Sequence, residues 1–172
     1  DGRFYKDKTV IVVGGGNTAA ADALYLARFA EKVYLVHRRD TLRAEKILSD
    51  PLLKAGNVEF VWNSAVVKLS CAERINGAEV KNVNTGDIRR ISADGIFISI
   101  GRKPATQFLG NALELDDSGY IIADETTKTN IDGVFAVGDV RTKPLRQIVT
   151  AVGDGAVAVH FAEEYLANIT DR

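Results

Sequence analysis

The first part of the chain alternates short apolar runs with segments of helical periodicity. Lys8 to Val13 (KTVIVV) is a continuous run of mostly β-branched residues, which predicts a strand buried on both faces. Residues 17–30 are good helix formers with apolar residues at helical spacing, and a second strand is predicted over 32–37. Residues 41–55 predict another helix, which Pro51 ends or interrupts.

The pattern changes from Val58 onward, where several short strands are separated by turn signals. Asn76-Gly77 and Thr85-Gly86-Asp87 mark these turns, so we predict an antiparallel β-meander inserted before a last strand over 95–100. The β-α-β-α-β order with right-handed crossovers predicts a parallel Rossmann-type sheet. The fold class is therefore α/β, and residues 1–104 are predicted to form a complete domain.

The remaining residues, 105–172, have a different pattern. Short strands are predicted within 119–140, and one long amphipathic helix is predicted over 146–169. A few strands and one helix do not obviously close a core of their own. We therefore expect this part of the chain to be a partial second domain.

The composition is that of an ordinary soluble globular protein, with 46% hydrophobic residues, 26% charged residues and a formal net charge of -1. This balance argues against a general surface for nucleic acid or membranes, so any anion site must be local. No apolar run approaches the roughly 18–20 residues that span a bilayer, and no signal peptide opens the sequence. No residue is assigned to a metal.

Cys71 is the single cysteine, which excludes an intrachain disulfide and fits a reducing compartment such as the cytoplasm. Its apolar surroundings predict a thiol that is buried and inert. The sequence has no methionine and begins at Asp1, so we expect translation to start elsewhere. A fragment, a single domain or an incompletely recorded chain would each explain this.

A glycine-rich stretch, Gly14 to Ala19 (GGGNTA), matches the pattern G-x-G-x-x-A between a predicted strand and a predicted helix. The first glycine allows a tight turn, the second lets the backbone approach a pyrophosphate, and the small last residue lets the helix pack closely. Backbone N–H groups at the helix start then face the anion. Glycines also occur at such turns for packing alone, but this context favours dinucleotide binding. The candidate residues are Gly14, Gly15, Gly16, Asn17, Thr18 and Ala19.

The second strand ends on His37, Arg38 and Arg39, at the position where an acid usually accepts a hydrogen bond from the ribose 2′-OH. Without that acid a 2′-phosphate is not repelled, and forked arginine side chains match phosphate oxygens. Arg43, expected in the first turn of the next helix, is placed to converge on the same group. The pattern favours NADPH over NADH, with a solvated basic loop as the alternative. The sequence is equally compatible with three roles for His37: packing, support of a neighbouring residue, or contact with the ligand.

Five segments in order carry a family resemblance. They are DGRFY (1–5), GGGNTAAADALYLA (14–27), VHRRDTLRAEKIL (36–48), GIFISIGRKP (95–104) and GVFAVGDVRTKPLRQIVTAVGDGAVA (133–158). From Asp1 to about Leu166 the chain resembles the low-molecular-weight, bacterial-type thioredoxin reductases. In that family an NADPH domain is inserted into a flavin domain. The resemblance implies that residues 1–104 are the NADPH-binding domain and that residues 105–172 are the C-terminal segment of the split FAD-binding domain.

The resemblance also assigns residues to both cofactors. Gly14 to Ala19 would hold the NADPH pyrophosphate, the three arginines its 2′-phosphate, and Ile100 and Gly101 would border the nicotinamide half. Gly138 and Asp139 resemble a motif that contacts the ribityl–phosphate part of FAD, with an exposed turn as the alternative. The last helix opens with Arg146, Gln147 and Ile148. In the family its N-terminus points at the flavin pyrimidine edge, where the dipole stabilises negative charge on reduced flavin.

The family carries a Cys-x-x-Cys pair immediately before DG-x-FY, and this pair is absent from the sequence. The resemblance implies hydride transfer from NADPH to FAD, then two electrons to the cysteine pair and on to thioredoxin or a similar small redox protein, in a homodimeric enzyme. We expect the chain as given to bind NADPH without reducing a disulfide, and we assign no catalytic residue. The alternatives are the flavoprotein reductase of a peroxiredoxin system, a ferredoxin-type NADP reductase, a non-catalytic NADPH-binding module, and a structural fragment.

Overall fold

The computed structural model describes residues 2–170, which divide into two compact units between Gly101 and Arg102. The first unit opens with a short 3-10 helix, η1 (Gly2–Tyr5), and then builds a parallel sheet. The strands of this sheet lie in the order β3-β2-β1-β7. Their bounds are Thr9–Val13 for β1, Lys32–Val36 for β2, Val58–Val61 for β3 and Gly95–Ile98 for β7. The α/β class and the Rossmann-type parallel sheet are thus confirmed.

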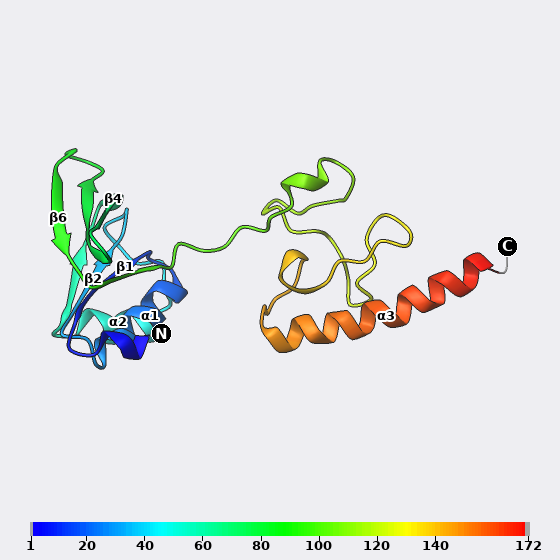
Figure 1. Ribbon diagram of the computed structural model, residues 1–172, viewed down its shortest axis with the longest axis horizontal. Helices are drawn as coiled ribbons and strands as arrows, with labels where there is room; N and C mark the ends of the chain where they lie inside the picture. Colours follow the sequence, from blue (N-terminus) through cyan, green and yellow to red (C-terminus); the bar gives the residue numbers. More distant parts are fainter. Residues whose placement is uncertain (1, 171–172) are drawn as a thin grey trace. The chain divides into compact units, whose positions relative to one another are not determined.

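Two other layers cover the faces of the parallel sheet (Figure 1). The helices α1 (Asn17–Ala27) and α2 (Lys46–Leu53) pack on one face. A three-stranded antiparallel sheet in the order β4-β5-β6 packs on the other. Its strands are β4 (Ser64–Cys71), β5 (Ile75–Asn82) and β6 (Ile88–Ser92), which confirms the predicted meander.

The central strand β1 shows why its sequence is a continuous apolar run. Successive side chains of a strand point to opposite faces of the sheet. Val10 and Val12 belong to the core beneath α1, whereas Ile11 belongs to the core beneath the meander. All three are fully buried, so β1 must be apolar at every position.

The structure corrects several predicted boundaries in the first unit. The helix predicted over 41–55 is only α2, which begins at Lys46 and continues two residues past Pro51. The segment before it is irregular, because its backbone bonds to the turn after β1 rather than to itself. Val58–Val61 pairs in parallel with β2 and is not part of the meander. The last strand ends at Ile98 instead of residue 100, and α1 ends at Ala27 instead of residue 30.

The second unit contains much less regular structure than expected. The strands predicted within 119–140 appear only as isolated bridges, such as Leu115 with Ile121 and Lys128 with Phe135. Two 3-10 helices, η2 (Gln107–Leu109) and η3 (Gly138–Val140), precede the long helix α3 (Ile148–Thr170). A bridge of one residue pair cannot build a sheet face, so the described part of this unit holds no sheet against which α3 could pack.

The core of the second unit is correspondingly small. Its buried apolar residues are Leu113, Ile121, Ala123 and Ala136. By contrast, Ile148, Val149, Val152 and Val159 of α3 are exposed. Within residues 2–170 no helix combines the length and the apolarity needed to cross a bilayer.

Cys71 is exposed, which corrects the expectation of a buried thiol. It is the last residue of β4, and the outer face of the three-stranded sheet is open to solvent near this end. Apolar neighbours in the sequence therefore did not indicate burial, because they alternate between the two faces of the strand.

Candidate functional site

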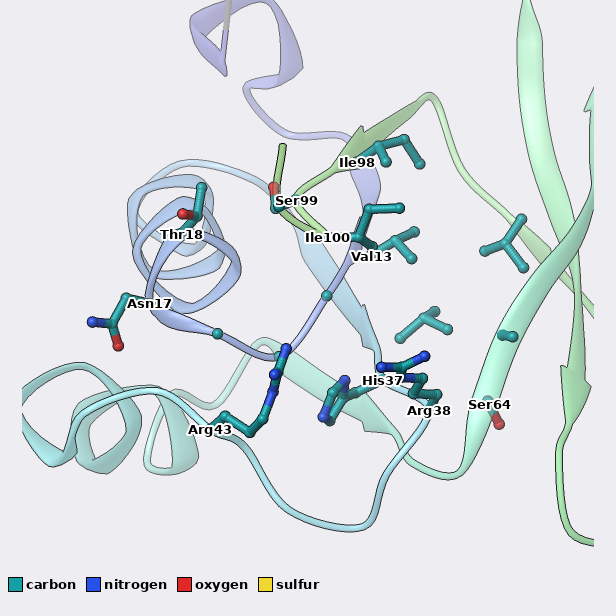
Figure 2. A pocket seen from close by; sticks show the side chains of 17 residues that line it. Val13, Asn17, Thr18, His37, Arg38, Arg43, Ser64, Ile98, Ser99 and Ile100 are labelled. Carbon is teal, nitrogen blue, oxygen red and sulfur yellow. The ribbon is translucent and has the colours of Figure 1, made fainter. Parts of the chain in front are cut away.

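A cavity of about 560 Å³ opens at the carboxyl ends of β1, β2 and β7 in the first unit (Figure 2). This is where ligands bind in open parallel sheets, because the chain turns in opposite directions on either side of β1. The cavity is lined by the turn after β1, the start of α1, the residues after β2, and residues 64–66 and 98–101. Most of the predicted nucleotide-binding residues line it: Gly14, Gly15, Gly16, Asn17, Thr18, His37, Arg38, Arg43, Ile100 and Gly101.

The turn Gly14–Gly16, called the glycine turn below, has a different steric constraint at each position. Gly14 has a φ of 147°, and a Cβ there would lie 2.3 Å from the carbonyl oxygen of Ser99. A Cβ on Gly15 would meet the His37 ring, whereas one on Gly16 would meet nothing within 4 Å. The first two glycines are therefore required by the protein itself, and Gly16 leaves space for a ligand.

The start of α1 is available to an anion. Gly16 is the N-cap residue and supplies no side-chain hydrogen bond, and the first turn has no acidic residue. Free N–H groups at a helix start carry partial positive charge, which favours phosphate. Ala19 does not line the cavity; it is fully buried, 2.8 Å from where a Gly14 Cβ would lie, so its small size serves packing.

Residues 38–45, called the arginine loop below, place two guanidinium groups at this cavity. Arg38 and Arg43 are exposed side chains that line it, while Arg39 is exposed but is not a lining residue. Figure 2 shows Arg38 and Arg43 gathered with His37 at one end of the cavity. Arg43 lies before α2, which begins at Lys46. This corrects the expectation that Arg43 belongs to the first turn of that helix. The loop contributes two positive charges where a phosphate could bind, with the third nearby.

His37 is held beneath the glycine turn and not presented freely to solvent. Its side chain is buried, it stands edge-on to Trp62, and its Nε2 atom has no hydrogen-bond partner among residues 2–170. Burial lowers the pKa of His37 below its ordinary value of 6.5, and the nearby charges of Arg43, Arg39 and Arg38 lower it further. A backbone hydrogen bond at Thr41 opposes this shift. The imidazole is therefore neutral near pH 7, with an unused nitrogen beside the arginines.

The other end of the cavity is bordered by the last residue of β7 and the residues that follow it. Ile98, Ser99, Ile100 and Gly101 all line it, and Ile100 is exposed. The Ser99 hydroxyl lies 2.5 Å from a carboxylate oxygen of Asp22 in α1, to which it donates. This hydrogen bond anchors the segment after β7 to α1, and so gives this end of the cavity a defined wall.

Sequence reasoning missed the contribution of β4 to the cavity. Ser64, Ala65 and Val66 line it, although they lie in the strand-rich insert and not in a recognised motif. The Ser64 N–H donates to the carbonyl oxygen of His37, which brings the start of β4 beside the arginine loop. Only the path of the chain after β3 places these residues there, and no local pattern marks them.

The predicted flavin-contacting residues lie in the second unit, and the structure brings some of them together. Asp139 and Arg146 both line a cavity of about 360 Å³, while Gln147 and Ile148 do not. The Arg146 guanidinium lies 3.8 Å from the ring centre of Tyr120, and its buried Nε atom has no partner among the described residues. Asp139 is exposed and lies 3.5 Å from Arg102. The cavity is thus lined by both a carboxylate and a guanidinium group.

The Gly138-Asp139 turn depends on a buried carboxylate that sequence reasoning missed. Asp154 of α3 accepts hydrogen bonds from the Gly138 N–H at 2.8 Å, from Arg141 at 2.9 and 3.0 Å, and from Lys143 at 2.7 Å. The hydrogen bonds from Arg141 are the main cause that holds the pKa of Asp154 far below its ordinary value. The acid within the GDG stretch of α3 was the only available signal, since an acid in an apolar helix needs a partner. No three metal-ligating side chains gather within residues 2–170.

Comparison with known proteins gives a consistent picture. Residues 3–155 match the family described as pyridine nucleotide-disulphide oxidoreductase. A thioredoxin reductase of Listeria monocytogenes is 44% identical over 172 residues, covering 99% of this chain and 54% of that protein. Thioredoxin reductase 2 of Arabidopsis thaliana is 45% identical over 170 residues, covering 96% of this chain and 44% of that protein.

Solved structures agree with this result. The thioredoxin reductase of Lactococcus lactis, in its FR conformation, aligns with a TM-score of 0.76 and 41% identity. The alignment covers 98% of this chain and 56% of the Lactococcus lactis chain. The thioredoxin reductase of Streptococcus pyogenes gives the same TM-score with 43% identity over 98% of this chain and 55% of its own. The chain thus spans about half the length of the relatives that it matches.

Proposed function

This chain belongs to the pyridine nucleotide-disulphide oxidoreductase family, and on that premise we propose that its first unit binds NADPH. One observation carries the proposal: the glycine turn, the uncapped start of α1 and two arginines line a single cavity. The pyrophosphate would lie against the glycine turn and the helix start, where N–H groups and the helix dipole favour an anion. The 2′-phosphate would lie between Arg38 and Arg43, at the end of β2.

The charges at the end of β2 favour NADPH over NADH. NAD-specific sites place a carboxylate here that accepts from the ribose 2′-OH and repels a phosphate. In this chain the residue after β2 is His37, which is neutral near pH 7, and the cavity-lining side chains that follow are guanidinium groups. Charge-assisted hydrogen bonds from arginine to phosphate are about twice as strong as neutral ones. The site therefore gains from the phosphate that an NAD site would reject.

The second unit is proposed to supply part of an FAD site. Asp139 and Arg146 line one cavity, and the buried Nε atom of Arg146 has no partner within residues 2–170, so it has hydrogen-bonding capacity available to a ligand. The exposed Asp139 carboxylate accepts from Arg102 at 3.5 Å through one oxygen, which leaves its other oxygen to accept from a ligand. Asp139 would accept from a ribityl hydroxyl, and Arg146 would donate to the flavin ring system. Gln147 and Ile148 do not line this cavity, and the Gln147 N–H donates to Thr150 Oγ1, so their contribution would come from the backbone N–H of Ile148 at the start of α3. When bound, the flavin is the group that accepts hydride from the nicotinamide.

The later steps of the proposed reaction need groups outside the sequence given. We propose that the whole protein passes electrons through a Cys-x-x-Cys pair to thioredoxin, as a cytoplasmic homodimer. Cys71 is the single cysteine in the sequence and lies at the end of β4, so it offers no pair. The chain as given is therefore expected to bind NADPH without reducing a disulfide. This also makes a non-catalytic NADPH-binding module the second candidate function.

Nucleotide titration tests the proposal directly. The chain is titrated with NADPH and with NADH, and the fluorescence of Trp62, its single tryptophan, is followed. A charge-assisted contact contributes about 1.5–3 kcal/mol, so NADPH should bind at least about tenfold more tightly than NADH. Equal dissociation constants would contradict the 2′-phosphate assignment. Turnover of thioredoxin by the isolated chain would contradict the claim that the disulfide relay is missing.

A further inference from the structure

We propose that Asn17 and Glu45 form a bridge that positions Arg43 for the 2′-phosphate, so that both are specificity-determining positioning residues. This inference rests on the proposed binding of NADPH. Neither residue needs to contact the nucleotide through its side chain. The bridge joins the first residue of α1 to the residue immediately before α2.

Two hydrogen bonds make up the Asn17–Glu45 bridge. The Asn17 amide nitrogen donates to Glu45 Oε1 at 3.0 Å, and the Glu45 backbone N–H donates to Asn17 Oδ1 at 2.8 Å. The Asn17 side chain thus uses both its oxygen and its nitrogen within the protein. In Figure 2 it points away from His37 and Arg38, although it belongs to the cavity lining. We therefore assign the Asn17 side chain to the bridge and not to direct contact with the nucleotide.

A third hydrogen bond ties the same loop to the glycine turn. The Arg43 backbone N–H donates to the carbonyl oxygen of Gly15 at 2.7 Å. Arg43 lies two residues before Glu45 in a segment without regular secondary structure. Its position is therefore set by contacts with the glycine turn and α1, and not by a helix of its own. The pyrophosphate-binding part and the phosphate-selecting part of the site are connected by these three bonds.

The negative charge of Glu45 allows the effect of the bridge to be distinguished from a direct electrostatic effect on the phosphate. A carboxylate near a phosphate site repels the phosphate, so removal of the charge alone would strengthen NADPH binding. Loss of the bridge would do the opposite, because Arg43 would then have to be ordered on binding. The two effects have opposite signs for NADPH. NADH lacks the 2′-phosphate but shares the pyrophosphate, so the ratio of the two dissociation constants isolates the effect on Arg43.

The test compares the variants Asn17→Ala, Glu45→Ala and the double variant. Dissociation constants for NADPH and NADH are measured for each of them. Asn17→Ala removes both hydrogen bonds of the bridge and should lower the ratio of the NADH constant to the NADPH constant by about three- to tenfold, the range of one hydrogen bond. Glu45→Ala removes only the bond to the carboxylate, because the backbone N–H of residue 45 can still donate to Asn17 Oδ1, and should lower the ratio by less. The double variant should lower it no further than Asn17→Ala does, because Asn17→Ala already removes the whole bridge. Additive effects, or an unchanged ratio in Asn17→Ala, would overturn the proposal.

Glu45→Gln is the matched control, because it keeps an oxygen that can accept from Asn17 and removes the charge. It should retain or increase the preference for NADPH. If Glu45→Ala and Glu45→Gln both strengthen NADPH binding, the residue acts by charge and the bridge is irrelevant. Thr18→Ala, at the neighbouring cavity-lining position, should change the two nucleotides alike.

Hydrogen exchange at the Arg43 amide supplies a readout that does not depend on any nucleotide. Exchange of this amide should accelerate in Asn17→Ala, while amides of β1 keep their protection and so show that the first unit is folded. Unchanged exchange at Arg43 would overturn the inference even if NADPH binds as proposed. If the unaltered chain does not prefer NADPH, the proposed function fails first, and the specificity role falls with it.

Discussion

The imidazole ring of His37 lies directly against the backbone of Gly15. A Cβ on Gly15 would lie 2.3 Å from Cε1 of His37 and 2.4 Å from each ring nitrogen. The residue after β2 thus occupies the space that a side chain at the middle of the glycine turn would need. The shape of the turn and the identity of residue 37 are therefore constrained together.

Gly15→Ala is expected to destabilise the first unit by about 1–3 kcal/mol, because His37 must move out of a packed site. The measurement is urea unfolding followed by Trp62 fluorescence, which reports on the first unit alone. Gly16→Ala is the matched control, since a Cβ there meets nothing within 4 Å. It should destabilise the unit less than Gly15→Ala does, because its cost is only that of alanine at a helix N-cap, and should still weaken nucleotide binding. Equal free energies of unfolding for the Gly15 and Gly16 variants would show that the His37 ring can move aside at little cost.

The three arginines are expected to differ in their effect on nucleotide preference. Arg38→Ala and Arg43→Ala should each weaken NADPH by about 1.5–3 kcal/mol, since both line the cavity, and should hardly affect NADH. Arg39→Ala should have the smaller effect, because Arg39 does not line the cavity. The variant with both Arg38→Ala and Arg39→Ala should lose far more affinity for NADPH than for NADH. Parallel losses for both nucleotides in titrations would refute the phosphate assignment.

His37 is expected to make the first unit less stable in mild acid. Its pKa in the folded chain lies below 6.5, so the unfolded chain binds more protons between the two pKa values. The contribution of His37 to the free energy of unfolding is therefore complete above about pH 7. It is lost as the pH falls from the unfolded-state pKa of 6.5 toward the lower folded-state pKa. The free energy of unfolding, measured by Trp62 fluorescence at several pH values, should fall less steeply in His37→Asn. Identical slopes would mean that His37 keeps its ordinary pKa.

Asp154→Asn is expected to destabilise the second unit by about 3–5 kcal/mol, because the buried Arg141 and Lys143 side chains would lose their buried counterion. Arg141 would keep the exposed carboxylate of Glu125, 3.8 Å away. Hydrogen exchange in peptides covering residues 134–145 measures this effect, since the single tryptophan lies in the other unit. Asp139→Asn is the control in the same turn. Its exposed ion pair with Arg102 contributes only about 0–1 kcal/mol.

The same carboxylate predicts acid sensitivity with a definite sign. The pKa of Asp154 in the folded chain is below its ordinary value of 3.8, so its stabilisation is present above that pH and is lost as the pH falls below it. The exchange difference between the Asp154 variant and the unaltered chain should therefore shrink in strong acid. A constant difference would show that the pair is not ionic.

Much of the first unit could be predicted because its signals are local. The buried run of β1, the glycine turn and the helix formers of α1 each occupy adjacent positions in the sequence. The meander followed from turn residues between short strands. The errors arose where a local pattern had two solutions. Residues 41–45 have helical composition, but the Arg43 N–H bonds to Gly15 and α2 begins later.

The second unit was harder to predict for a related reason. Residues 119–140 contain apolar and turn residues in a strand-like order, yet they form only isolated bridges. A strand needs a neighbour along most of its length, and composition does not report whether one is present. The exposure of Cys71 has the same origin, since burial depends on what covers the face of β4.

By itself, the sequence determined the α/β class, the strand–turn–helix unit and the basic residues after the second strand. These follow from periodicity and from the backbone freedom of glycine, which are properties of neighbouring residues. Only the tertiary structure decided that Arg38 and Arg43 line the cavity while Arg39 does not. It also decided that Asn17 pairs with Glu45, and that Asp154 holds the Gly138 turn. These contacts join residues far apart in the chain, and their geometry depends on how the intervening loops close.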